Sequence, residues 1–229
     1  MLLGNSNLHR KCEMKSHWLV LIAIITLSVS ACAQKLPSDT MKYSTAFERS
    51  ILAGQSLPGT DIKYLGKTDQ GAQMSLGGQA ALKRTLDSLT WHGEPVPGVS
   101  VDYSLRIISF DDKALQAGGT AKVVVSNVKT QAVSLASLPK DALTFKGVVT
   151  YNVPQGRTIP GTTITYDGKT PDGAKLGGIE GYAFRKEADS IAWFGKLTDK
   201  CFLELDLRLL VYTDSAMQVT GTATLYLKP

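Results

Sequence analysis

Hydrophobic and polar residues alternate along the segment 201–212. Apolar side chains occupy its odd positions, and polar ones such as Glu204 and Asp206 occupy several of the even ones. Because successive side chains of a strand point to opposite faces of a sheet, this alternation predicts a β-strand with one buried face. Residues 216–227 alternate in the same way after the turn residues 213–215, which predicts an antiparallel hairpin.

The same pattern is present earlier in the chain, over residues 99–107, and Asp111-Asp112-Lys113 supplies the turn that follows it. Residues 79–89 are compatible with one or two helical turns, but no long helix is predicted. The chain is therefore predicted to be an all-β protein. Shorter strands are predicted at residues 61–65, 86–92, 143–153, 162–166 and 189–194.

A segment near the middle of the chain recurs, with few changes, about a hundred residues later. Leu57-Pro58-Gly59-Thr60 returns as Ile159-Pro160-Gly161-Thr162, so that position 57 matches position 159 at an offset of 102 residues. At the same offset, Gly119-Thr120-Ala121 returns as Gly221-Thr222-Ala223. Self-similarity at a fixed spacing indicates two copies of one structural unit. The expected fold is two tandem copies of an antiparallel β-sandwich or small barrel unit.

The matched positions also set the expected domain boundaries. The connector between the two units is expected to add at most one edge strand. Because each unit of about 83 residues can hold about six strands, a separate hydrophobic core is expected in each copy, with some contact between copies because units of this size are only marginally stable alone. The expected parts are a signal peptide at 1–31, a tether at 32–42, a first β unit at 43–127, a connector at 128–144 and a second β unit at 145–229.

The N-terminal residues predict export. Basic residues including Lys11 and Lys15 precede an apolar run over residues 18–29, which is followed by small residues. This order is typical of a secretory signal peptide, and the run is shorter than the roughly 20 apolar residues of a transmembrane helix. Translation could begin at Met1 or at Met14, since Met14 is followed directly by Lys15 and the apolar run.

Val29-Ser30-Ala31-Cys32 resembles the lipobox of bacterial lipoproteins. This resemblance implies that a peptidase cuts before Cys32, that Cys32 carries the lipid, and that the protein is anchored in a membrane of the cell envelope. The alternative is an ordinary signal cleavage after Ala33. Several acyl chains would hold the protein firmly, because each buried CH₂ contributes about 0.8 kcal/mol.

The cysteine count and the net charge limit the possible disulfide bonds and the classes of binding partner. The three cysteines are Cys12, Cys32 and Cys201, so acylation of Cys32 leaves Cys201 without a disulfide partner in the mature chain. The formal net charge is +5 and falls to about +3 without the signal, and no basic cluster contains interleaved aromatic residues. Nucleic-acid binding is therefore excluded, and no cofactor is expected.

Two motifs that suggest chemistry are better explained by structure. Gly66-Lys67-Thr68 and its copy lack the glycine that a phosphate-binding loop needs five residues earlier, so Lys67 and Lys169 are interpreted first as solvated turn residues. Histidine is nearly absent after the signal, where only His92 remains, which argues against a repeated metal or nucleophilic site. Cys201 lies on an apolar face and is interpreted as a small buried hydrophobe.

The residues that recur in both copies are the candidate site residues. Sugar- and peptide-binding β modules present aromatic rings to ligands, although a tryptophan in such a sequence more often fills a core. No catalytic residue and no metal site is predicted. The candidate ligand-binding residues are Tyr64, Lys67 and Trp91 with their counterparts Tyr166, Lys169 and Trp193.

The leading functional hypothesis is a lipid-anchored envelope protein whose two β units bind an envelope protein, a glycan or a small apolar ligand. An alternative is an exported hydrolase that acts on glycans through carboxylates shared by both copies, which are Asp87, Asp112, Asp189 and Asp214. A further alternative is a purely structural envelope component.

Overall fold

The computed structural model describes residues 39–138 and 141–228. Their regular structure consists of β-strands and one turn of 3₁₀ helix over Leu135–Ser137, which confirms the all-β class. The first repeat contains β1 (Met41–Leu52), β2 (Ile62–Thr68), β3 (Gly71–Leu76), β4 (Gln79–Lys83), β5 (Ser88–Val96), β6 (Val99–Phe110) and β7 (Ala114–Val125). After β8 (Gln131–Ala132), the second repeat contains β9 (Leu143–Pro154), β10 (Thr165–Thr170), β11 (Gly173–Gly177), β12 (Phe184–Arg185), β13 (Ser190–Thr198), β14 (Cys201–Tyr212) and β15 (Ala216–Leu227).

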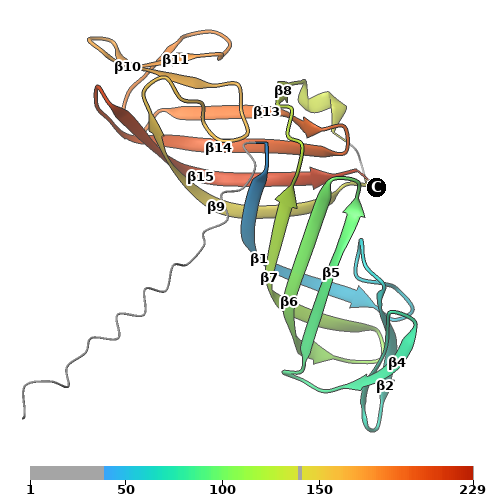
Figure 1. Ribbon diagram of the computed structural model, residues 1–229. Coiled ribbons are helices and arrows are strands. Elements are labelled where there is room, and N and C mark those ends of the chain that lie inside the picture. Colours follow the sequence, from blue (N-terminus) through green and yellow to red (C-terminus); the bar gives the residue numbers. More distant parts are fainter. Residues whose placement is uncertain (1–38, 139–140, 229) are drawn as a thin grey trace, which may run out of the picture. The chain divides into compact units, whose positions relative to one another are not determined.

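Each repeat folds into one large and one small antiparallel sheet (Figure 1). The large sheets have the orders β1-β7-β6-β5 and β8-β13-β14-β15-β9, and the small ones have the orders β2-β3-β4 and β10-β11-β12. All four sheets are open, with an edge strand on each side, so the small-barrel alternative is wrong. The small sheets contribute buried side chains such as Tyr64 and Tyr166 to the same hydrophobic cluster as the large ones.

The strands of the two repeats match in position as well as in order. β1, β5, β6 and β7 recur as β9, β13, β14 and β15 with both ends displaced by the 102 residues of the sequence offset. The β-bulges recur too, because the register shifts between Ile107 and Ser109 in β6 and between Leu209 and Val211 in β14. The domain boundaries expected for the two units therefore lie within two residues of the first strand of each repeat.

The small sheet of the first repeat includes residues 79–83, whose sequence is also compatible with helical turns. Residues 79–83 form β4, which pairs with β3 through a hairpin at Gly77 and Gly78. Both glycines have positive φ, 58° and 82°, as a two-residue type I′ hairpin requires. This turn returns the chain as a strand, so residues 79–83 do not form the helical turns with which the sequence of 79–89 is compatible.

The repeated Pro-Gly pair forms a β-turn of one specific type. In Leu57-Pro58-Gly59-Thr60, the Thr60 N–H donates to the Leu57 carbonyl at 3.0 Å, and Gly59 takes a φ of 77°. Proline at the second position and glycine at the third are the residues that a type II turn favours. The Thr60 hydroxyl donates to the same carbonyl and accepts from the Ile62 N–H. Thr162 makes the same bonds in the second repeat.

The two repeats share one hydrophobic core. Buried residues of both large sheets and both small sheets belong to a single cluster, so the expectation of two separate cores is wrong. The aromatic rings of Phe47 and Phe145 join the repeats directly, with centroids 5.7 Å apart, and Tyr103 lies 4.8 Å from Phe47 and 6.1 Å from Phe145. Units this small bury too little surface alone, which is the physical reason for the shared core.

The contacts between the repeats are symmetric. A Cβ atom added to Gly59 would lie 3.0 Å from Leu143 Cδ2, and one added to Gly161 would lie 2.7 Å from Met41 Cε. Gly161 is the counterpart of Gly59, and Leu143 is the counterpart of Met41. The two contacts are thus one contact with the partners exchanged, as at the self-complementary interface of a two-fold dimer. The repeats are related by a pseudo-two-fold axis within one chain.

The connector contributes the expected edge strand to one repeat. Gln131 and Ala132 of β8 pair with Lys196 and Gly195 of β13, and the Lys129 N–H donates to the Leu197 carbonyl at 2.8 Å. The second large sheet therefore has five strands where the first has four.

Candidate functional site

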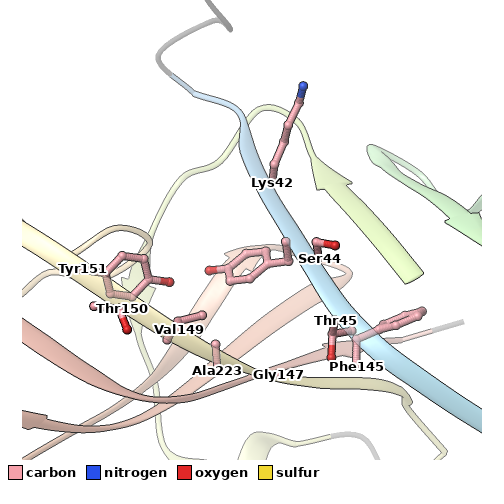
Figure 2. A pocket seen from close by; sticks show the side chains of 10 residues that line it. Lys42, Ser44, Thr45, Phe145, Gly147, Val149, Thr150, Tyr151 and Ala223 are labelled. Atoms are coloured by element: carbon pink, nitrogen blue, oxygen red, sulfur yellow. The ribbon is translucent and has the colours of Figure 1, made fainter. Parts of the chain in front are cut away.

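A pocket opens where the edge strands β1 and β9 meet (Figure 2). Its volume is about 210 Å³, and it is lined by residues 42–45 of β1, by Phe145, Gly147 and 149–151 of β9, and by Ala223 of β15. β1 and β9 contact each other without forming a ladder, and the Thr45 hydroxyl donates to the Lys146 carbonyl between them. We call this cavity the β1–β9 pocket.

The pocket exists because the two repeats differ at matched positions. Phe47 of the first repeat corresponds to Val149 of the second, and Tyr103 corresponds to Leu205. The rings of Phe47 and Tyr103 contact each other in a tilted arrangement and fill their side of the contact, while the smaller Val149 leaves space on the other side. Substitution of a large core side chain by a smaller one leaves a cavity when the surroundings cannot collapse.

The chemistry of the β1–β9 pocket is dominated by hydroxyl groups. Ser44, Thr45, Thr150 and Tyr151 line it together with Tyr43. Figure 2 shows Lys42 extending away from Thr150 and Tyr151. The pocket therefore presents neutral donors and acceptors next to aromatic and aliphatic surface.

Tyr43 is the most unusual of these residues. Its hydroxyl is buried and makes no hydrogen bond of good geometry with the described residues. Burial raises the pKa of Tyr43 strongly, and the neighbouring Tyr151 hydroxyl raises it further. Burial likewise raises the pKa of Tyr151. Both phenols therefore stay protonated, and the Tyr43 O–H is a donor whose interaction with the Tyr151 hydroxyl lacks good geometry, which is costly for a buried group.

Two predicted candidates, Tyr64 and Tyr166, are fully buried. Their hydroxyls donate to the backbone carbonyls of Asp111 and Thr213, which are themselves counterparts. Each tyrosine thereby ties its small sheet to the turn of the long hairpin in its repeat. Burial and this hydrogen bond explain the recurrence of both residues in terms of the fold, and their role in ligand binding stays an untested prediction.

The predicted tryptophans also support the fold. Trp91 Nε1 donates to Asp61 Oδ1 at 2.8 Å, and Trp193 Nε1 donates to Thr163 Oγ1 at 3.1 Å. Each indole covers the glycine two residues further on, where an added Cβ would lie 2.4 Å from the Trp91 ring and 2.3 Å from the Trp193 ring. The Trp-x-Gly spacing thus reflects an aromatic ring packed over a strand glycine.

The predicted lysines are exposed and have different partners. Lys169 Nζ lies 6.0 Å from the centroid of the Tyr212 ring, whereas Lys67 adds a minor part to the lowering of the pKa of Asp111, which two backbone N–H donors cause first. Neither lysine lines the β1–β9 pocket. Their candidacy for ligand binding stays a prediction.

The carboxylates shared by the repeats serve local turns. Asp87 Oδ2 accepts from the Arg84 N–H at 2.8 Å, and Asp189 Oδ2 accepts from the Lys186 N–H at 2.7 Å. Asp112 and Asp214 are exposed in hairpin turns. This use of Asp in turns is common, and it accounts for the repetition of these residues.

The residues that occur once have ordinary surroundings. His92 is exposed and pairs through Nδ1 with Asp102, on the neighbouring strand β6. Cys201 is buried, and burial raises the pKa of its thiol to about 12, which agrees with its interpretation as a small hydrophobe. Among residues 39–138 and 141–228, no group of three or more His, Cys, Asp or Glu side chains is arranged to hold a metal ion.

Sequence reasoning missed Tyr43 and Tyr151 because it favoured positions that match between repeats. Tyr43 corresponds to Phe145, and Tyr151 corresponds to Arg49, so neither tyrosine recurs at its matched position. The repeated tyrosines, tryptophans and Asp87/Asp189 make contacts that support the common fold. The informative signal is the opposite one, a change of side-chain size or polarity between matched positions of β1 and β9.

Comparisons of the chain with protein-family models, with curated proteins and with solved structures found no match. The described part of the chain contains no helix that is long and apolar enough to cross a membrane. The predicted signal peptide and the lipidation site Cys32 lie outside the described residues.

Proposed function

We propose that this protein is a lipid-anchored binding protein of the cell envelope, and that the β1–β9 pocket takes one sugar unit of a glycan. The observation that carries the binding proposal is the buried Tyr43 hydroxyl, which makes no hydrogen bond of good geometry with the described residues, lies beside the Tyr151 hydroxyl and belongs to the lining of an open pocket. A ligand oxygen would satisfy this donor. The lipid anchor rests on the lipobox resemblance at Cys32.

The composition of the pocket favours a neutral, hydroxylated ligand. A sugar ring offers hydroxyl groups around its edge and C–H groups on its faces, and the pocket offers phenol and alcohol groups next to the Phe145 ring. Its volume of about 210 Å³ is below the range of roughly 300–1,000 Å³ for drug-sized ligands. One ring at the end or side of a larger glycan suits this size.

The sugar proposal is tested by removing single hydroxyl groups. Tyr43→Phe keeps the ring and removes the buried hydroxyl donor, and Tyr182→Phe is the matched control because Tyr182 is exposed and does not line the pocket. With glucose and N-acetylglucosamine as probes, calorimetry or NMR titration should show about three- to tenfold weaker binding for Tyr43→Phe, the effect of one neutral hydrogen bond. Equal affinity of both variants, or no binding of either sugar, would refute the proposal.

The anchor is tested separately. Cys32→Ser should move the protein out of the membrane fraction and lower its mass by the acyl groups. A variant that stays in the membrane fraction with its mass unchanged would exclude a lipoprotein, whatever the result with sugars.

A further inference from the structure

A second cavity lies next to Arg49, between residues of the first repeat and residues of the connector and the second repeat. It has a volume of about 320 Å³ and is walled by apolar side chains that include Pro58, Pro95, Leu143 and Leu227. Arg49 contributes the positive charge of the lining, and the exposed Asp141 contributes the negative charge. We call this cavity the Arg49 pocket. It shares no lining residue with the β1–β9 pocket.

Arg49 has unused hydrogen-bonding capacity. Its Nε atom is buried without a hydrogen-bond partner, and its guanidinium makes no ion pair with a carboxylate of the described residues. The guanidinium carbon lies 5.6 Å from the centroid of the Phe47 ring. A cation over a ring uses the face of the guanidinium, so the N–H donors at its edge stay available for a planar acceptor.

A second unused donor lies nearby. The Tyr103 hydroxyl is buried and has no hydrogen-bond partner among the described residues. Burial raises the pKa of Tyr103, although the neighbouring Arg49 charge lowers it in part, so the phenol stays protonated. Tyr103 does not line the Arg49 pocket, so Arg49 supplies the donor that faces this cavity, and Tyr103 lies behind it within reach of the guanidinium charge.

The common fold does not require these two residues. The counterpart of Arg49 in the second repeat is Tyr151, and the counterpart of Tyr103 is Leu205. A guanidinium held only for the stability of the repeat would be expected in both copies. Its presence in one copy, without a carboxylate partner, indicates a role specific to the first repeat.

We propose that the Arg49 pocket binds a small apolar monocarboxylate. The carboxylate accepts from the Arg49 guanidinium, whose planar fork matches its two oxygens, and the apolar body lies against Pro58, Pro95 and Leu143. The exposed Asp141 carboxylate repels a second negative charge, which disfavours phosphate and dicarboxylates. This proposal is independent of the sugar proposal, because the two sites have separate linings.

Benzoate is the probe for this proposal, with neutral benzamide and inorganic phosphate as comparisons. The full mature chain is titrated with each compound by calorimetry, and the Nε–H signal of Arg49 is followed by NMR. We expect benzoate to bind and to shift this signal, with benzamide at least about tenfold weaker and phosphate weaker still. Binding of phosphate as tight as that of benzoate, equal binding of benzamide, or no binding of benzoate would overturn the proposal.

The variants separate a local role from a general effect of charge. Arg49→Gln should weaken benzoate at least about tenfold, and Arg49→Lys should weaken it less, because the ammonium keeps the charge and loses the fork. Arg157→Gln is the matched control, since Arg157 is an exposed arginine on the second repeat. Thermal melting identifies variants that fail to fold, and in that case Ala142→Phe, which narrows the pocket, takes the place of Arg49→Gln. Undiminished benzoate binding by folded Arg49→Gln, or by folded Ala142→Phe where it takes that variant's place, would contradict the proposal.

Discussion

Thr45 and Gly147 occupy matched positions of the two repeats and contact each other. A Cβ atom on Gly147 would lie 2.9 Å from the Thr45 Cβ, and the Thr45 hydroxyl donates to the backbone carbonyl next to Gly147, that of Lys146. A position that meets its own counterpart lies on a two-fold axis. Two threonines would collide there, so the sequences of the repeats have to differ at this point.

This relationship predicts the result of exchanging the two residues. Gly147→Thr should destabilise the protein by about 1–3 kcal/mol, the usual cost of overpacking. Adding Thr45→Gly should recover most of this loss, because the pseudo-two-fold axis brings each residue to the place of the other. Urea unfolding of the single and double variants measures the coupling free energy.

Val148→Thr is the control for that exchange, because Val148 is the neighbouring residue of β9 and is 79% exposed. It should leave the free energy of unfolding nearly unchanged. If Thr45→Gly and Gly147→Thr act additively, the two positions are not coupled and the axis does not pass between them.

The buried tyrosines of the small sheets predict a matched pair of effects. Tyr64→Phe removes the donor to the Asp111 carbonyl, and Tyr166→Phe removes the donor to the Thr213 carbonyl. Each change should lower the free energy of unfolding by about 1 kcal/mol, the net value of one such hydrogen bond. Denaturant titration measures the loss, and similar values in both repeats are expected. No change in either variant would show that these bonds do not stabilise the folded protein.

The shared core predicts that one repeat does not fold stably without the other. Residues 143–229 by themselves would expose Phe145 and the rest of the surface that β9 buries against the first repeat. We expect this fragment to unfold without a cooperative transition and to bind hydrophobic dyes, and to gain structure when residues 39–138 are added. Circular dichroism and calorimetry are the measurements. A cooperative, dye-free transition of the isolated fragment would restore the two-core model.

The buried thiol predicts a dependence of stability on alkaline pH. Burial raises the pKa of Cys201 from an ordinary value of 9.0 to about 12. Below pH 9 the thiol is protonated in the folded and the unfolded chain, and its contribution is fully present. Between pH 9 and 12 the unfolded chain loses the proton while the folded chain keeps it, so the free energy of unfolding falls as pH rises.

Cys201→Val tests this contribution, because valine is the residue at the matched position 99. Relative to its own value at pH 8, the variant should lose less stability than the original chain on going to pH 11, measured by urea unfolding. Burial also raises the pKa values of the buried tyrosines Tyr64 and Tyr166. Their titration should therefore cause part of the loss of stability in both proteins. Identical pH profiles would show that Cys201 is not responsible.

The strands were predictable because their pattern is local. β14 was predicted with its bounds, and the alternation that predicts it follows from one buried face per sheet. β4 was missed because the two glycines at 77 and 78 act through backbone angles that propensity does not reveal. The candidate residues Tyr64 and Trp91 were found as repeated positions, but repetition marks what the fold needs twice.

The pocket residues were not predictable in the same way. Tyr43 and Arg49 lie on β1 at positions whose counterparts differ, and nothing local distinguishes a tyrosine in a filled contact from one in an open pocket. For Tyr43, the outcome depends on Val149, which is distant in the sequence and takes the place of the larger Phe47.

The sequence by itself determined the all-β class, the duplication and the long hairpin that ends each repeat, because alternation and self-similarity are properties of short segments and of their spacing. The tertiary structure decided that the repeats share one core around a pseudo-two-fold axis, and that the pockets form where the matched side chains differ. Those features come from the packing of β1 against β9. In that contact, whether a side chain fills the space or leaves a cavity depends on the size of the residue opposite it across the axis.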